Sequence, residues 1–201
     1  MPIEFPQPPE QARALAEGGV SAAIDSAREH RISPRLTTAA ADRSPALSRP
    51  HATYNLTPHD IAERRPLAAA RLTAWRFLIA SAGEPLAAGE VDLDGAGHPI
   101  SFASLNIGPF VGSTLSALET AEKMPEVANG RYEARLLRIP EMYVMALWLK
   151  PRNAGDGIVV PLNPAPPALL ARHAYDEAGF LAALAAPARE CIAMAERLKH
   201  E

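Results

Sequence analysis

The chain has 201 residues, a formal net charge of −3 and a hydrophobic content of 48%. This length suits one domain with an appendage or two small domains, and the apolar content is sufficient for a buried core. The nearly balanced charge argues against the basic surface that non-specific nucleic-acid binding needs, so we expect no nucleic-acid partner.

Cysteine content and the first residues bear on the cellular compartment. Cys191 is the only cysteine, which excludes an intramolecular disulfide and a cysteine-based zinc site. Residues 1–10 contain neither a basic leader nor an apolar stretch of signal-peptide length. We therefore expect a cytoplasmic protein without a membrane partner.

The first third of the chain differs in composition from the rest. Residues 1–66 hold nine of the 20 prolines, at positions 2, 6, 8, 9, 34, 45, 50, 58 and 66. Two weak helices are predicted, over Glu10–Glu17 and Val20–Glu29, separated by a Gly-Gly pair. Residues 31–51 offer little to bury, so they are either disordered or held against another surface. We interpret residues 1–66 as an extended, partly helical N-terminal arm and residues 67–201 as the folded body.

Helix and hairpin signals follow in the middle of the chain. Thr57 is a good cap for a short helix that ends before Pro66. A helix is predicted over Leu67–Trp75. The apolar segment Trp75–Ala80 is either the last turn of this helix or the first strand, and we favour a strand from about Ala74. Two further strands, Leu86–Leu93 and Ile100–Ile107, flank an Asp-Gly pair that is typical of a β-hairpin. Ser113 or Thr114 is expected to cap the next helix, which runs to Lys123.

The rear of the chain contains the clearest core signal. Met142–Leu149 has no charged residue, is too short to cross a bilayer, and suits a strand buried on both faces. Tyr132–Ile139 and Ile158–Leu162 are its expected neighbours, and Asp176–Leu198 is a predicted helix that Pro187 kinks or restarts. These elements indicate an α+β fold: an antiparallel sheet of five to six strands with helices packed on one face.

The connection between a predicted strand and a predicted helix is our candidate for ligand binding. Free amides at a helix N-terminus attract anions, although a phosphate loop would need Lys in place of Ser113. An ordinary capped connection explains the same pattern, and we favour that interpretation. If a small anion binds, the candidate residues are Asn106, Gly108, Ser113 and Thr114.

Other chemical signals are weaker. Glu90, Asp92 and Asp94 project from one face of a strand close to His98, but a calcium loop counted from Asp92 would need Glu rather than Ala103 at its twelfth position. We interpret this face as solvated and assign no metal, no cofactor and no catalytic residue. The histidines do not form a metal-binding pair at helical spacing.

A second cluster suggests an interface. Arg135 and Arg138 precede Met142, Tyr143 and Trp148, and these residue types are enriched at interface centres. The alternatives are an exposed sheet face, with the arginines paired to nearby glutamates, or a core.

Together these observations favour a non-enzymatic interaction or assembly module that binds a protein partner or a second copy of itself through the arm and the body. The alternative is a small-ligand-binding domain or small enzyme with its pocket at residues 106–114. A secretion-type chaperone is a third hypothesis, based on element order alone. The sequence resembles no family that we recognise.

Overall fold

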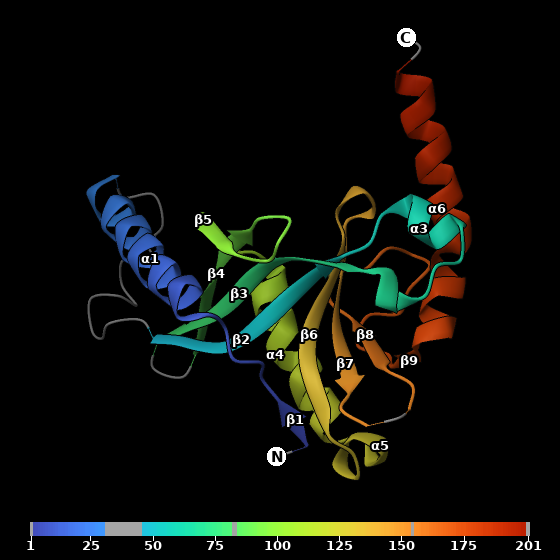
Figure 1. The fold of residues 1–201 in the computed structure, drawn as a ribbon, viewed down its shortest axis with the longest axis horizontal. Coiled ribbons are helices and arrows are strands. Elements are labelled where there is room, and N and C mark those ends of the chain that lie inside the picture. The colour runs from blue at the N-terminus through green and yellow to red at the C-terminus, as the bar shows by residue number, and fades with distance from the viewer. Residues whose placement is uncertain (1, 31–45, 82–83, 154, 200–201) are drawn as a thin grey trace.

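The computed structural model describes residues 2–30, 46–81, 84–153 and 155–199, and a nine-stranded sheet organises them (Figure 1). The strand order is β5-β4-β3-β2-β6-β7-β8-β9, and β1 lies beside β6. Strands pair in antiparallel fashion except that β1 and β2 both run parallel to β6. The strands are β1 (Ile3–Glu4), β2 (Ala46–Asn55), β3 (Arg71–Ser81), β4 (Glu84–Leu93), β5 (Pro99–Asn106), β6 (Tyr132–Ile139), β7 (Val144–Pro151), β8 (Ile158–Pro161) and β9 (Tyr175–Asp176).

Strand β7 confirms the buried strand that the uncharged run predicts. It lies between β6 and β8, and both of its faces are covered. The strand begins two residues later than expected, because Pro140–Met142 forms a 3₁₀ turn (η2) and Tyr143 follows in the left-handed conformation with φ 53°. Its buried residues are Val144, Ala146, Leu147, Trp148 and Leu149.

Helices cover both faces of the sheet. Helix α1 (Glu10–His30) packs on β4 and β5, and α6 (Glu177–Leu198) packs on the same face at the other end of the sheet (Figure 1). Helix α4 (Pro109–Glu122) covers the opposite face, against β4, β7 and β8. The short elements are α3 (Pro58–Ala62), α5 (Pro125–Ala128) and the 3₁₀ turn η1 (Leu67–Ala69).

The α+β class is confirmed, but two details of the prediction are wrong. The sheet is larger than five to six strands, because β1 and β2 come from the segment interpreted as an arm and β9 from a connection. The helices do not lie on one face only. Strand β6 turns Leu136 towards α4 and Leu137 towards α6, so both of its faces need an apolar cover.

Several element boundaries also differ from the prediction. Helix α1 continues through the Gly-Gly pair, where Gly19 lies directly under the Phe102 ring and any Cβ would clash with it. Residues 67–75 form one 3₁₀ turn and the start of β3 rather than a helix. Helix α3 forms as expected: Thr57 accepts from the Asp60 amide, and the Asp60 carboxylate accepts from the Thr57 amide.

The described parts of residues 1–66 pack on the rest of the same chain. The Tyr132 amide donates to the Pro2 carbonyl, and Arg131 pairs with Glu4. Strand β2 lies at the centre of the sheet. Residues 31–45, for which the sequence predicts disorder or attachment, lie outside the described residues, and the division into an arm and a body at residue 66 stays a prediction.

Helix α6 is relevant to the prediction that the protein has no membrane partner. Of the described helices, it is long and apolar enough to cross a bilayer, which is a weak criterion that core helices also meet. Its Phe180, Leu184 and Ala188 are buried against the sheet. The expectations of a cytoplasmic protein and of no membrane partner therefore stay predictions.

The packing of β7 gives a first testable prediction. Leu147→Ala should lower the free energy of unfolding by about 3 kcal/mol, because the substitution leaves a cavity in a site closed on both faces. Urea denaturation measures this change. The control Ile100→Ala alters a residue that is 58% exposed on β5 and should change stability by less than about 0.5 kcal/mol. Equal effects of the two substitutions would contradict the central position of β7.

Candidate functional site

The predicted ligand-binding connection is organised differently from the expectation. Helix α4 begins at Pro109, with Gly108 as its N-cap, and no side chain caps it. Proline suits the first helical position because it has no amide hydrogen to satisfy. Ser113 and Thr114 therefore lie inside the helix, and the prediction that one of them caps it is wrong.

The four candidate residues have separate roles in the structure. Thr114 is fully buried; its hydroxyl donates to the Phe110 carbonyl at 2.6 Å and accepts from Arg76 at 3.0 Å. The Ser113 hydroxyl accepts from the Asn163 amide at 2.6 Å. Asn106 is exposed and bonds to Ser104, and Gly108 is exposed as well. No described contact joins Asn106 to Ser113 or Thr114, and ligand binding by the four residues stays a prediction.

The carboxylates of Glu90 and Asp94 have different environments in the structure. Glu90 is buried beneath α4 and accepts a hydrogen bond from Arg138, so the interpretation of a solvated face is wrong for this residue. Asp94 closes the hairpin turn by accepting from the amides of Ala96 and His98, and these bonds lower the pKa of its carboxyl group. Within the described ranges, no group of three His, Cys, Asp or Glu residues is placed to hold a metal ion.

The interface hypothesis for Arg135 and Arg138 is only partly compatible with the burial. Arg135 pairs with Glu133 at 2.7 Å and lies over the ring of Trp148, which is almost completely buried. Tyr143, in contrast, is 66% exposed. Trp148 is therefore core, Arg135, Arg138 and Met142 are half-buried, and Tyr143 is exposed.

A buried polar cluster lies between the sheet and α4. Arg76 on β3 is 2% exposed and stands opposite Glu90 on β4, so their charges compensate each other. Arg138 on β6 donates to Glu90 and to Asn55 of β2. Burial lowers the pKa of Arg76 to about 10, a fall that the Glu90 carboxylate opposes. The cluster links strands β2, β3, β4 and β6, and it joins them to α4 through Thr114.

His51 borders this cluster and is fully buried. Neither of its ring nitrogens makes a hydrogen bond, and the Phe5 ring stands edge-on to it at 5.4 Å. Burial, together with the positive charge of neighbouring Arg76, lowers the pKa of His51 to about 3. His51 is therefore neutral at physiological pH.

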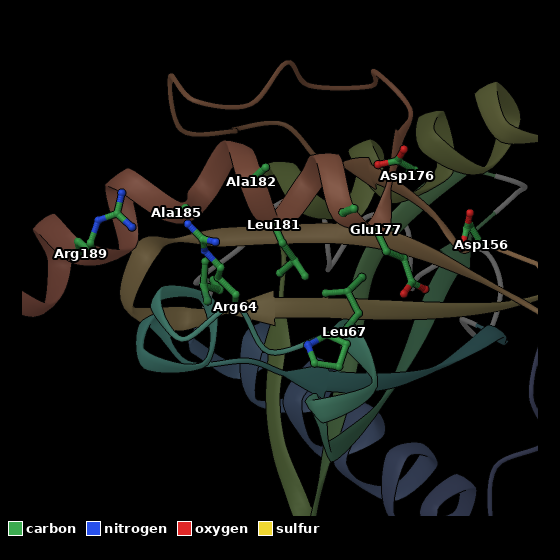
Figure 2. A pocket seen from close by; sticks show the side chains of 12 residues that line it. Arg64, Leu67, Asp156, Asp176, Glu177, Leu181, Ala182, Ala185 and Arg189 are labelled. Atoms are coloured by element: carbon green, nitrogen blue, oxygen red, sulfur yellow. The ribbon is translucent and has the colours of Figure 1, made fainter.

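An open groove of about 720 Å³ runs along α6 on the opposite face of the sheet (Figure 2). One wall is α6, and the other is formed by α3, η1 and the turn between them. This volume is within the range of binding pockets for small molecules or short segments. The groove is lined by Ile61, Arg64, Pro66, Leu67, Asp156, Asp176, Glu177, Ala178, Leu181, Ala182, Ala185 and Arg189.

Charges of opposite sign occupy opposite ends of this groove. Figure 2 shows Asp156, Asp176 and Glu177 at one end, which we name the acidic end, and Arg64 and Arg189 at the other, the basic end. Between these ends the two walls are apolar and include Leu67, Leu181 and Ala185.

Local structure fixes two of the acidic side chains. Asp176 caps α6 by accepting from the Gly179 amide, and Glu177 accepts from Trp148 Nε1 at 2.8 Å. These bonds anchor the beginning of α6 on the sheet. Asp156 and both arginines of the basic end are exposed, and none of the three makes an ion pair with another described residue. Their charges are available to a bound partner.

The comparisons with known proteins identify no relative. No family model matches the chain, and neither the curated proteins nor the solved structures contain a match to it. We therefore infer the function from the geometry of the groove.

The groove is a feature that we did not predict from the sequence. Leu181, Ala185 and Arg189 recur every four residues, which places them on one side of α6. That side is rotated away from the side that buries Phe180 and Leu184. A second helical stripe distinct from the core stripe was therefore the available signal, but nothing in the sequence places α3 and η1 opposite it.

The environment of His51 predicts a pH-dependent stability. Between pH 6.5 and about 3 the unfolded state binds a proton at His51 that the folded state does not, so the free energy of unfolding falls as the pH falls through this window. The loss attributable to His51 at pH 5, relative to pH 8, should be about 2 kcal/mol. Denaturation of wild type and His51→Leu across this range tests it: the variant should lose this part of the dependence, while exposed His59→Gln should keep it.

The polar cluster gives a second prediction. Glu90→Gln removes the carboxylate that faces Arg76 and Arg138, so two buried or half-buried cations lose their counter-charge. We expect the free energy of unfolding to fall by about 3 kcal/mol. Asp92→Asn on the same strand changes an exposed carboxylate and should cost less than about 0.5 kcal/mol. If Glu90→Gln leaves the free energy of unfolding unchanged, the cluster does not hold α4 on the sheet.

Proposed function

We propose that the protein is a non-enzymatic interaction module whose contact site is the groove between α6 and the α3–η1 segment. The observation that carries this proposal is the separation of the acidic and basic ends by an apolar stretch of the groove walls. An elongated amphipathic protein segment with charges of opposite sign at its ends complements such a groove, with electrostatics setting its direction.

The composition of the groove favours a protein partner over a small substrate. Its described lining contains no Ser, Cys or His that would act as a nucleophile or a base near neutral pH. Asp176 and Glu177 are engaged in anchoring α6. The two arginines lie at the end opposite the carboxylates, which suits contact with a partner along the groove rather than convergence on one reacting atom.

Only the last part of the described arm belongs to the contact site that we propose. Helix α1 packs on the sheet and β2 is part of it, whereas Ile61, Arg64 and Pro66, from the end of the arm, line the groove that we propose for the partner. The hydroxyls of Ser113 and Thr114 already bond within the chain, which gives the alternative ligand pocket no specific support.

Site-specific photo-crosslinking tests the proposal. Ala182 is exposed and lines the groove, and we would replace it with p-benzoylphenylalanine and irradiate cells that produce the protein. We expect a covalent adduct with a protein from this position, because a bound segment would lie within reach of the probe. The matched control carries the same residue in place of exposed Glu119 on α4.

The pattern of adducts decides the outcome. A protein adduct at position 182 that is absent at position 119 supports a groove partner. No adduct at position 182, or the same adducts at both positions, contradicts the proposed function. Mass spectrometry of the adduct identifies whether the partner is a second copy or another protein.

A further inference from the structure

The second half of α6 extends beyond the body of the protein. The helix has 22 residues, and its last buried residue is Ala188. Residues 190–199, which we name the projecting half, extend past α3 (Figure 1); half-buried Cys191 still donates to the Glu141 carbonyl, and every side chain from Ala193 to Lys199 is exposed. Met194 and Leu198 are 60% and 65% exposed and share one side of the helix, at four-residue spacing. The projecting half therefore exposes two large apolar side chains to solvent beside the groove.

We propose that the projecting half of a second copy occupies the groove, with the two α6 helices antiparallel. This inference rests on the proposed function, because it names the occupant of the same groove. Each copy inserts its projecting half and receives that of its partner, so the contact is two-fold symmetric and closes as a dimer.

Charge complementarity sets the direction of insertion. The projecting half begins with Glu190, and near its end Arg197 and Lys199 outnumber Glu196. In the antiparallel arrangement the two cations point towards the acidic end of the groove, and Glu190 lies near its basic end. A parallel arrangement would reverse these contacts and bring like charges together.

The length of the groove also agrees with the length of the projecting half. The groove follows α6 from Glu177 to Arg189, which at 1.5 Å per residue is about 18 Å. The projecting half is about 15 Å long by the same measure. If Lys199 of one copy lies beside Glu177 of the other, the symmetry axis passes near Ala188. The neighbouring Ala185 and Ala186 are small, so the two helices can approach closely there.

The mixed charge of the projecting half favours a second copy over a membrane surface. Helices that lie on anionic lipids concentrate cations on their polar face. Here Glu190 and Glu196 accompany Arg197 and Lys199, which suits a groove that presents both signs of charge.

Sedimentation of the full chain at several concentrations tests the dimer. The wild type should reach twice the 21.5 kDa mass of one chain. Leu198→Lys should weaken association at least tenfold, because it places a charge on the inserted apolar side while leaving the fold of each copy unaffected. The matched control, Ile100→Lys, changes an equally exposed apolar residue on β5 and should dimerise as the wild type does.

A charge-reversal pair tests the direction of insertion. Lys199→Glu and Asp156→Lys each remove an attraction between copies and should each weaken the dimer about threefold or more. The double variant restores opposite charges and should recover most of the lost affinity. Additive losses in the double variant would contradict the antiparallel arrangement.

The remaining outcomes separate this inference from the proposed function. A chain that stays monomeric at high micromolar concentration, or a dimer that Leu198→Lys leaves intact, overturns the inference. If position 182 then crosslinks to a different protein, the proposed function stands without it. Flotation of a monomeric wild type with anionic vesicles, lost in Leu198→Lys, would instead assign the projecting half to a membrane surface.

Discussion

The parallel pairing of β2 with β6 is the constraint on which the rest of the structure depends. It joins two antiparallel halves, β5-β4-β3-β2 and β6-β7-β8-β9, into one sheet. Without this ladder the chain would form two small sheets, each with an exposed edge. The buried polar cluster reinforces the same junction, because Arg138 of β6 bonds to Asn55 of β2 and to Glu90 of β4.

The groove is a consequence of that junction. Helix α3 and η1 follow β2 along the chain, so the central position of β2 brings them close to the strands that α6 covers. Helix α3 then packs directly on α6, and the apolar residues of both line the groove. The acidic end depends on the strand next to β6, because Trp148 of β7 holds Glu177 at the beginning of α6.

The two faces of the sheet therefore have different characters. The face beneath α4 encloses charged and polar side chains that bond mainly to one another, while His51 is held neutral among them. The opposite face carries α1 and α6 at its two ends, and α6 continues past the sheet into solvent. Buried apolar clusters cover both faces, and the groove that we propose as a contact surface lies beside the second.

The sequence by itself determined the elements whose signals are local. The cap at Thr57, the Asp-Gly hairpin, the uncharged strand β7 and the helix over α6 all depend on residues close together in the chain. Tertiary structure alone decided the rest. Strand β2 has little apolar pattern and forms because β3 and β6 supply its hydrogen-bond partners, and Glu90 is buried because Arg76 and Arg138 compensate its charge. The groove requires α3 and α6 to meet across more than a hundred residues of sequence, and such a long-range contact leaves no periodicity in the chain.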